Sequence, residues 1–323
     1  EAEGGTLRSQ DLRTPDDPTG LDGTIIRIDP NTGAASPDNP NSGAVQPNAR
    51  RIVAYGLRNP FRFAQRPGTR ELWLGDVGLA SYEEVNRLTD PTAPGAGVTN
   101  FGWPCYEGDG MPGSRVQPAY HSYQLGICER LYTEEKAHPG TVTGPFYAYF
   151  HDLPYTDHST CAQARVATVP NSLSSSISSM SFYGGGDYGA AYDGGLFFGD
   201  YARRCIWFMG KGSDGEPDPA DVSVFAQGAG FPVDLKQGPG GDLYYVDIVD
   251  GAVNRIRHTD LKASVSADKT LGPAPLSVDL SATVTGLPAG HTASYQWDFN
   301  GDGYFGDGGE ASATPTHAFP DVK

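Results

Sequence analysis

The acidic segment near the end of the chain has the residue spacing of a calcium-binding loop. Asp298, Asn300 and Asp302 alternate with other residues and are followed by Gly303, as in the D-x-N-x-D-G pattern. Carboxylate and amide oxygens are the hard donors that Ca²⁺ requires. Position twelve of this loop is Gly309 instead of the bidentate glutamate of an EF-hand. The spacing therefore predicts a weak Ca²⁺ site, with an acidic Asx-rich turn that binds no metal as the alternative.

The chain has four cysteines, Cys105, Cys128, Cys161 and Cys205. None lies in a C-x-x-C pair and no histidine lies at zinc-finger spacing from them, so we expect no metal site there. An even number of cysteines in a glycine- and tyrosine-rich chain is typical of disulfides formed in an oxidising compartment. Four cysteines allow three pairings. We favour Cys105–Cys128, which closes a short loop, together with Cys161–Cys205.

Composition excludes two classes of function. The formal net charge is −16, so the surface repels the phosphate backbone of nucleic acids. No apolar stretch approaches the roughly 18 residues that a membrane-spanning helix needs. The 43 glycines and 26 prolines favour an all-β fold with many tight turns. We therefore expect an exported all-β protein with no nucleic-acid partner and no membrane span.

The first four-fifths of the chain contain a repeated sequence unit. The strands of this unit must position any functional site there. Each unit is an apolar strand that ends in aspartate, a turn, and a second strand. The units are Leu72–Asp76 with Glu84–Leu88, Leu196–Asp200 with Cys205–Phe208, and Leu243–Asp247 with Val253–Ile256, and Gly23–Ile28 resembles the second half of another. Asp200 and Asp247 are 47 residues apart, close to the length of one propeller blade. The repeat predicts three to four blades of a β-propeller whose strands are buried on both faces, with a β-sandwich as the alternative.

Two segments depart from the repeat. Asp76 and Asp200 are 124 residues apart, which predicts a loop-like insertion from Cys105 to about Ser175. After about residue 260 the repeat is lost, and residues 263–323 predict a small Ig-like β-sandwich. Its expected strands are Ser264–Ala267, Leu276–Leu280 and Ala293–Phe299. Because the chain starts in the middle of a unit and ends inside the sandwich pattern, we expect both domains to be incomplete.

Several motifs, in order, resemble the glucose/sorbosone dehydrogenase family, whose members are soluble aldose dehydrogenases dependent on pyrroloquinoline quinone (PQQ). The motifs are Gly56–Pro60, Leu72–Leu88, Asn100–Pro104, Phe198–Tyr201 and Pro232–Leu235. The resemblance implies a six-bladed β-propeller, of which residues 1–258 supply the C-terminal blades. Residues 263–323 resemble a PKD domain through the motif Tyr295–Gly303, which implies an incomplete extracellular spacer domain.

The resemblance also implies where the cofactors bind. PQQ accepts a hydride from the sugar C1 carbon, while the protein supplies orientation, charge and a base. Arg58 and Asn59 lie at the family's cofactor contact, where a guanidinium fork binds a carboxylate or quinone oxygen. The main-chain carbonyls of Gly78 and Leu79 lie where the family binds a Ca²⁺ ion that polarises the quinone. The alternatives are a structural arginine beside a turn-forming asparagine, and a plain hairpin turn.

The general base of the family is a histidine that precedes the strand matching Gly23–Ile28. Residues 1–22 contain no histidine, so we expect the base upstream of this chain and an inactive fragment. His121, His151 and His158 fall in the insertion and do not match this position.

The family's lysine and arginine contacts to the PQQ carboxylates match Ala202, Phe231 and Val233 here. Their loss puts PQQ use and glucose specificity in question, and Arg203, Arg204 and Lys236 are candidate replacements.

These observations predict a secreted or periplasmic oxidoreductase that binds PQQ and Ca²⁺ and oxidises aldoses to lactones. It would pass the electrons to an external acceptor. The alternative is a non-catalytic extracellular propeller that binds carbohydrate or protein, with the PKD domain as a spacer. The histidine expected upstream distinguishes the two.

Overall fold

The fold is known from a computed structural model of the chain. It describes residues 5–14, 17–79, 81–108, 124–151, 161, 175–259, 261–287, 290–300 and 311–320. The chain divides into two compact units, Glu1–Ile256 (unit 1) and Arg257–Lys323 (unit 2). The described strands form five small sheets, in which nearly all neighbours are antiparallel. The described part of the chain is therefore mostly β, as predicted.

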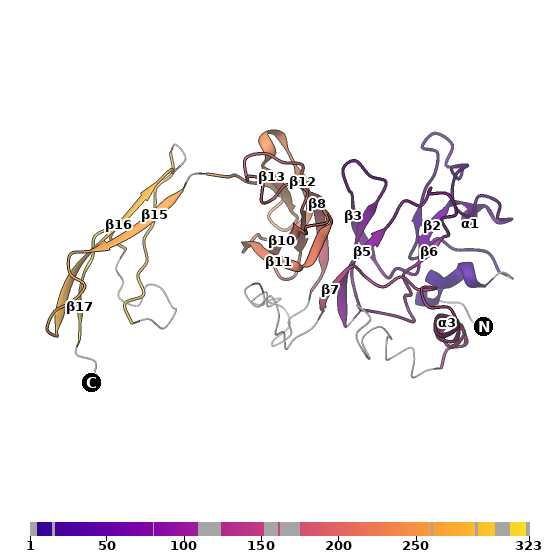
Figure 1. The fold of residues 1–323 in the computed structure, drawn as a ribbon, viewed down its shortest axis with the longest axis horizontal. Helices are drawn as coiled ribbons and strands as arrows, with labels where there is room; N and C mark the ends of the chain where they lie inside the picture. The colour runs from indigo at the N-terminus through magenta and orange to yellow at the C-terminus, as the bar shows by residue number, and fades with distance from the viewer. Residues whose placement is uncertain are drawn as a thin grey trace. The chain divides into compact units, whose positions relative to one another are not determined.

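Unit 1 contains four sheets, of which the first two are interleaved in the chain and the last two follow in order (Figure 1). The first sheet joins β1 (Ile25–Ile26), β2 (Ile52–Tyr55) and β6 (Thr99–Asn100). The second joins β3 (Pro60–Gln65), β4 (Leu72–Asp76), β5 (Tyr82–Leu88) and β7 (Tyr147–Phe150). The third joins β8 (Ile177–Phe182), β9 (Leu196–Asp200), β10 (Cys205–Lys211) and β11 (Pro217–Gln227). The fourth joins β12 (Pro232–Gln237), β13 (Leu243–Asp247) and β14 (Ala252–Ile256).

The core of unit 1 lies between successive sheets. Strand β8 packs against β3 and β4 on one side and against β12 on the other. Every residue of β8 and β9 is buried, so these strands are covered on both faces, as the continuous apolar runs predict. Between the second and third sheets, Trp73 packs edge-on against Phe182 with ring centres 5.6 Å apart.

The repeated units are confirmed as antiparallel hairpins. Asp76 pairs with Glu84, Asp200 with Cys205, and Asp247 with Ala252. The aspartate at the end of each first strand is buried. A buried carboxylate must find hydrogen-bond donors, and these find them in the adjoining backbone. Asp200 accepts the N–H groups of Ser176 and Arg203, both at 2.8 Å.

The predicted insertion is more regular than expected. Helix α3 (Gly126–Ala137) lies within it, and β7 completes the second sheet. The helix buries Ile127, Cys128 and Leu131, whose spacing places them on one face. The prediction of a loop-like segment is therefore wrong for residues 126–137 and 147–150. The other helical elements of unit 1 are short: η1 (Gly5–Arg13), α1 (Pro47–Arg51) and η3 (Pro239–Gly241).

Both predicted disulfides are confirmed. Cys105–Cys128 ties the loop after β6 to α3, and Cys161–Cys205 ties residue 161 to the start of β10. Among the described residues, no helix has the length and apolar character needed to cross a bilayer.

Unit 2 has one sheet, of β15 (Lys262–Ala267), β16 (Leu276–Thr285) and β17 (Thr316–Phe319). The first two strands confirm the predicted strands there. The strand predicted over Ala293–Phe299 is wrong, because these residues are irregular. Their aromatic side chains pack onto the segment that follows: the Trp297 indole donates to the Ser312 carbonyl at 3.0 Å, and the Phe299 ring stacks on His317. The described residues of unit 2 thus show one layer and not the two of a sandwich.

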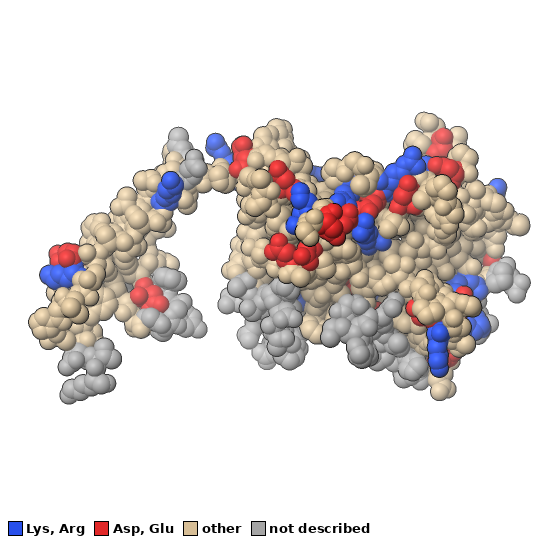
Figure 2. Space-filling view, in the orientation of Figure 1, with Lys and Arg blue, Asp and Glu red and all other residues tan. Residues whose placement is uncertain are grey.

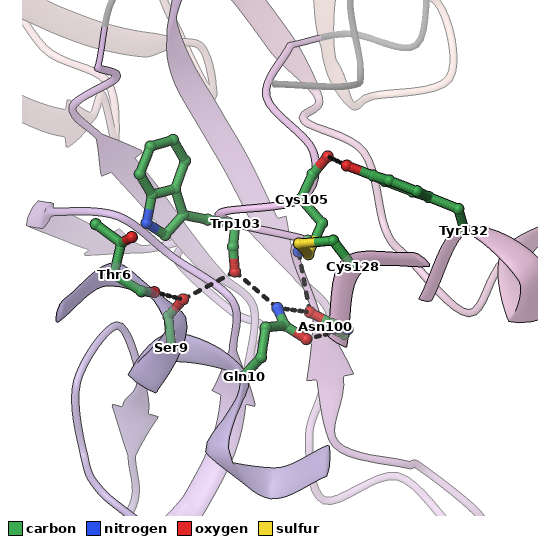
Figure 3. Close-up of a disulfide and its surroundings, with 9 residues drawn as sticks. Thr6, Ser9, Gln10, Asn100, Trp103, Cys105, Cys128 and Tyr132 are labelled. Atoms are coloured by element: carbon green, nitrogen blue, oxygen red, sulfur yellow. Dashed lines mark hydrogen bonds between the residues drawn. A yellow bond between two sulfur atoms is a disulfide. The ribbon is translucent and has the colours of Figure 1, made fainter. Parts of the chain in front are cut away.

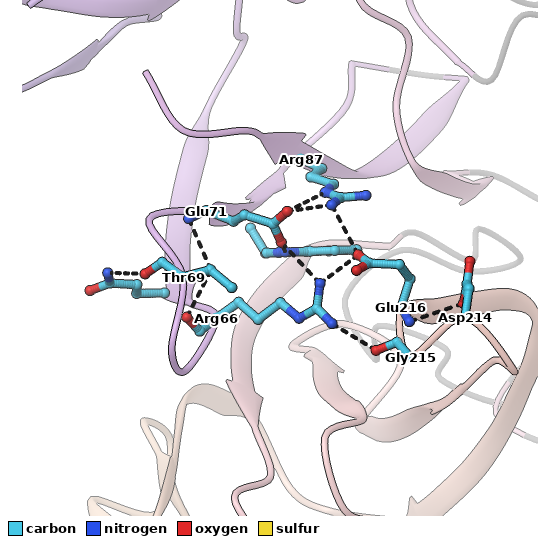
Figure 4. Close-up of polar contacts among 9 residues, drawn as sticks. Arg66, Thr69, Glu71, Arg87, Asp214, Gly215 and Glu216 are labelled. Atoms are coloured by element: carbon cyan, nitrogen blue, oxygen red, sulfur yellow. Dashed lines mark hydrogen bonds and ion pairs between the residues drawn. The ribbon is translucent and has the colours of Figure 1, made fainter. Parts of the chain in front are cut away.

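Charged side chains on the face of unit 1 in Figure 2 alternate in sign and form no basic stripe there. Arg66, Glu71, Arg87 and Glu216 form an ion-pair network between the second and third sheets (Figure 4). Glu216 Oε2 lies 2.5 Å from Arg66 Nη1 and 2.9 Å from Arg87 Nη2, and Glu71 contacts both arginines. The network is only partly exposed, so it is screened less than an isolated surface pair.

We expect Glu216→Gln to lower the free energy of unfolding by about 1 kcal/mol, because two arginines then lose a shared partner. Urea unfolding followed by tryptophan fluorescence measures the change. Asp38→Asn, which breaks the exposed pair between Arg27 and Asp38, is the control and should cause no measurable loss. Equal effects of the two substitutions would show that the network does not join the sheets.

Candidate functional site

A pocket of about 540 Å³ opens on unit 1 at the turn between β2 and β3. Its walls come from η1, from the segment before β1, from the turn itself and from the loop after β6. The lining residues are Gly5, Thr6, Ser9, Asp22, Gly23, Leu57, Arg58, Asn59 and Trp103. Both residues predicted to contact the cofactor, Arg58 and Asn59, therefore lie in the wall of one pocket.

The carboxylate of Asp76 fixes the turn that carries these two residues. Asp76 is buried at the end of β4 and accepts the backbone N–H groups of Arg58 at 3.0 Å and Asn59 at 2.6 Å. The N–H of Val77 donates to the Asn59 carbonyl at 3.1 Å. The Arg58 guanidinium donates to the Val77 carbonyl at 2.8 Å, which limits where its free edge can point.

A glycine allows the close approach of backbones at the pocket floor. Gly23 has φ +59°, and a Cβ there would lie 2.1 Å from the Leu57 carbonyl oxygen. The N–H of Leu57 donates to the Gly23 carbonyl at 3.1 Å. A larger residue at 23 would therefore push the turn away from the segment before β1.

Trp103 forms one wall and is held by its main chain (Figure 3). Its carbonyl accepts hydrogen bonds from Ser9 Oγ at 2.8 Å and from Gln10 Nε2 at 2.7 Å. The buried Gln10 also exchanges hydrogen bonds with the side chain of Asn100. The Arg58 guanidinium lies 5.8 Å from the centre of the Trp103 ring, within cation–π range. The wall thus places a largely buried aromatic ring, 4% exposed, beside a cation.

The Cys105–Cys128 disulfide joins the loop that carries Trp103 to α3 (Figure 3). The Tyr132 hydroxyl on α3 donates to the Cys105 carbonyl at 2.9 Å. Sequence reasoning missed the roles of Ser9, Gln10 and Trp103. Their only signals were the Asn100–Pro104 motif and the cysteine directly after it.

Gly78 and Leu79, the predicted calcium ligands, form a turn just after Val77. The Gly78 N–H donates to Glu83 Oε1 at 3.3 Å, and the Leu79 N–H donates to Glu107 Oε1 at 2.9 Å. No described residue donates a hydrogen bond to the carbonyl of Gly78 or Leu79. These two residues do not line the pocket, but the Arg58–Val77 hydrogen bond joins the turn to it. Free carbonyl oxygens are the kind of donor that fits a hard cation.

Buried carboxylates gather behind this turn. Burial raises the pKa of Glu84 to about 8, and the charge of Asp76 adds to the effect. Burial likewise raises the pKa of Asp76 to about 7, although the N–H groups of Arg58 and Asn59 oppose it. Glu84 accepts the Gly108 N–H at 2.7 Å and the Asn86 amide at 3.0 Å. Asp76 and Glu84 therefore share their protons as a pair near neutral pH.

His151 does not line the pocket and contacts the buried Glu83 instead. Its Nδ1 contacts Glu83 Oε1, and the other oxygen of Glu83 accepts the Ile177 N–H at 2.8 Å. Burial raises the pKa of Glu83, against the hydrogen bond from His151. His121 and His158 lie outside the described residues.

The positions matching the family's cationic contacts hold no cation. Ala202 and Val233 are buried, and Phe231 packs against Tyr201 with ring centres 5.1 Å apart. The candidate replacements have other partners: Arg203 is buried and donates to Ser175 Oγ at 2.6 Å, Arg204 lies over the Phe231 ring, and Lys236 pairs with Asp234 at 3.6 Å.

The predicted calcium loop of unit 2 is only partly described. Asp298 and Asn300 lie at the end of the irregular segment before β17, and Asp302 lies outside the described residues. Within the described ranges, no group of three or more His, Cys, Asp or Glu side chains is arranged to hold a metal ion. The loop stays a prediction.

Residues 5–143 match the family model described as Glucose / Sorbosone dehydrogenase. No curated protein sequence matches the chain. A solved glucose dehydrogenase is 21% identical, with a TM-score of 0.50 over 76% of this chain and 57% of that one. The soluble aldose sugar dehydrogenase of Escherichia coli, in its apo form, is 22% identical, with a TM-score of 0.45 over 72% of this chain and 54% of that one.

This chain thus spans little more than half the length of those two structures. At such identities the likeness shows the fold alone. The family match covers Arg58, Asn59, Gly78 and Leu79, so the pocket and the adjoining turn both lie inside it.

We expect Glu84→Gln to flatten the pH dependence of stability between roughly pH 5 and 8. A carboxyl whose pKa is raised on folding holds a proton that the unfolded chain has lost, so its contribution falls as pH rises through this window. The substituted amide carries no charge at any pH and removes that loss. Urea unfolding at several pH values measures the slope.

Glu134→Gln is the matched control, because a hydrogen bond from Arg13 lowers the pKa of Glu134 and places its titration below this window. The control should follow the wild-type slope. If the free energy of unfolding depends on pH in the same way in Glu84→Gln and in the wild type, the raised pKa of Glu84 is contradicted.

Proposed function

We propose that unit 1 is part of a PQQ- and Ca²⁺-dependent aldose dehydrogenase, which oxidises aldoses to lactones and passes electrons to an external acceptor. The observation that carries the proposal is the shared pocket of Arg58 and Asn59, inside the segment that matches the glucose/sorbosone dehydrogenase family. The proposal includes a β-propeller fold, which the stacked sheets of unit 1 support.

The pocket has the chemistry that a flat, anionic cofactor needs. Its volume of about 540 Å³ is within the usual range for small-molecule sites. Arg58 offers a charged fork to a carboxylate or quinone oxygen, and Asn59 offers an exposed side-chain amide. Trp103, which lines the pocket although it is only 4% exposed, would contact the body of the molecule. The carbonyls of Gly78 and Leu79 would hold Ca²⁺ beside it.

PQQ, when bound, supplies the hydride acceptor that no protein side chain can provide. The residues of this chain would bind and orient. Arg58, held by Asp76 and Val77, would set the position of the cofactor's polar edge. Asp22 would accept hydrogen bonds from sugar hydroxyls, since it is the carboxylate among the described lining residues.

No histidine is among the described residues that line the pocket. Loss of a general base typically costs about 10²–10⁴-fold in rate. We therefore propose that the described pocket binds the cofactor and that turnover needs a base from outside the described lining. The apolar positions Ala202, Phe231 and Val233 leave fewer cations for the PQQ carboxylates, which argues against assigning glucose as the substrate.

The two disulfides support an oxidising, extracytoplasmic location for the protein. We propose that unit 2 is a PKD domain that serves as a spacer. Its support is the Tyr295–Gly303 motif and two of the expected strands.

A second candidate function is supported by the same pocket. An aromatic ring beside a carboxylate and an amide also suits a neutral sugar, and the cationic contacts expected for PQQ are absent from the described β9–β12 region. In that case unit 1 would be a non-catalytic carbohydrate-binding domain.

We expect PQQ to quench tryptophan fluorescence saturably in the presence of Ca²⁺, because Trp103 lines the pocket. Arg58→Gln should weaken this binding about tenfold or more, the loss expected for a charge-assisted hydrogen bond. Arg62→Gln, which removes a partly exposed arginine from the neighbouring strand β3, is the control and should leave the affinity unchanged.

Circular dichroism verifies that each variant is folded. Absence of saturable quenching in the wild type, together with binding of an aldose alone, would replace the dehydrogenase proposal with the carbohydrate-binding one.

A further inference from the structure

A second pocket, of about 260 Å³, lies between the loop that follows β1 and the short helix α1. It shares no lining residue with the pocket of Arg58. Its lining residues are Ala34, Ala35, Ser36, Pro37, Ser42, Pro47, Arg50 and Arg51. Two arginines and two serines thus face a small cavity whose lining includes no carboxylate, on a chain of net charge −16.

The walls of this pocket are tied together by buried asparagine. Asn39 is 3% exposed, and its amide donates to the carbonyls of Arg27 at 2.8 Å and Arg50 at 2.9 Å. Asn41 donates to the Ala49 carbonyl at 3.3 Å. These bonds join the loop to α1 next to the cavity. The pocket is therefore formed before any ligand arrives, which lowers the entropy lost on binding.

The guanidinium groups of Arg50 and Arg51 differ in their hydrogen bonds to the protein. Arg51 Nε donates to the Gly33 carbonyl at 2.8 Å and its Nη1 donates to Asn48 Oδ1 at 2.9 Å, so its guanidinium is fixed with one nitrogen left over. Among the described residues, the Arg50 guanidinium has no hydrogen bond or ion pair, and neither serine hydroxyl is used. A fixed cation, a cation with no partner among the described residues, and two hydroxyls thus remain available as donors.

The nearest acidic side chains on this loop are already engaged. Asp38 forms hydrogen bonds with the Arg27 guanidinium at 2.5 and 3.1 Å. Asp29 accepts the N–H groups of Asn31 and Thr32 within its own turn. Neither is free to neutralise Arg50, so the positive charge at the pocket is uncompensated from within the described loop.

We propose that this pocket binds an oxyanion group, a carboxylate, sulfate or phosphate, on a small ligand such as a sugar acid. Guanidinium groups bind planar and tetrahedral oxyanions through paired N–H donors, and serine hydroxyls complete the set. Ala35, Pro37 and Pro47 give the uncharged body of the ligand an apolar surface. The volume limits that body to about the size of one monosaccharide, since it falls below the usual range for drug-sized ligands.

The test is calorimetric titration of the whole chain at low ionic strength with D-glucuronate, inorganic sulfate and inorganic phosphate, and with D-glucose as the neutral analogue. We expect saturable binding of at least one oxyanion, and weakening of about tenfold or more in Arg50→Gln. Tighter binding of glucuronate than of the inorganic ions identifies a sugar acid as the ligand. Equal binding identifies the bare oxyanion, and both results support the site.

Two control variants separate this site from general attraction and from the first pocket. Arg70→Gln removes an exposed arginine close enough to contribute to the lowered pKa of Asp38, and it should leave the affinity unchanged. Arg58→Gln should leave the affinity for inorganic sulfate and phosphate unchanged, which keeps this inference independent of the proposed dehydrogenase activity. The proposal is overturned if no oxyanion binds saturably, or if either control weakens binding of these inorganic ions as much as Arg50→Gln does.

Discussion

The burial of one carboxylate, that of Asp76, holds together the second sheet and the candidate site. It ends strand β4, and the donors that satisfy it are the backbone N–H groups of Arg58 and Asn59. A charge in this position is costly unless it is hydrogen-bonded, and burial raises its pKa to about 7. The geometry of the pocket wall is thus set by the need to satisfy a buried group. The arginine fork stays available because its orientation is fixed by main-chain contacts.

Two other buried aspartates at strand ends also accept backbone N–H groups, but the turns that they fix differ. Asp200 and Asp247 also end strands and accept nearby N–H groups, but the turns that they fix carry other side chains. At Asp200 the turn places a buried arginine against Ser175, where it supports the fold. Chemistry therefore depends on which side chains the fixed turn presents, while the repeat itself supplies only the scaffold.

The sequence was informative where the interaction was local or repeated. The hairpins and their terminal aspartates followed from the repeat, and the favoured one of three possible cysteine pairings is the one observed. The family resemblance pointed to Arg58 and Asn59, and the structure places both in the wall of one pocket. The rest depended on contacts between distant segments. Tertiary packing explains helix α3 inside the predicted loop and the irregular course of residues 293–299. It also explains the hydrogen bond from Gln10 to the carbonyl of Trp103, which lies 93 positions away. Single-sequence patterns carry little signal for such contacts.

We propose that the pocket of Arg58 and the turn of Gly78 and Leu79 form one cofactor site. A crystal structure of the chain soaked with PQQ and Ca²⁺ tests this. We expect a planar molecule beside Trp103, with a polar edge on Arg58 and Asn59 and a cation on the carbonyls of Gly78 and Leu79. A planar molecule bound elsewhere, or a cation that avoids those carbonyls in a crystal where PQQ is bound, would contradict it.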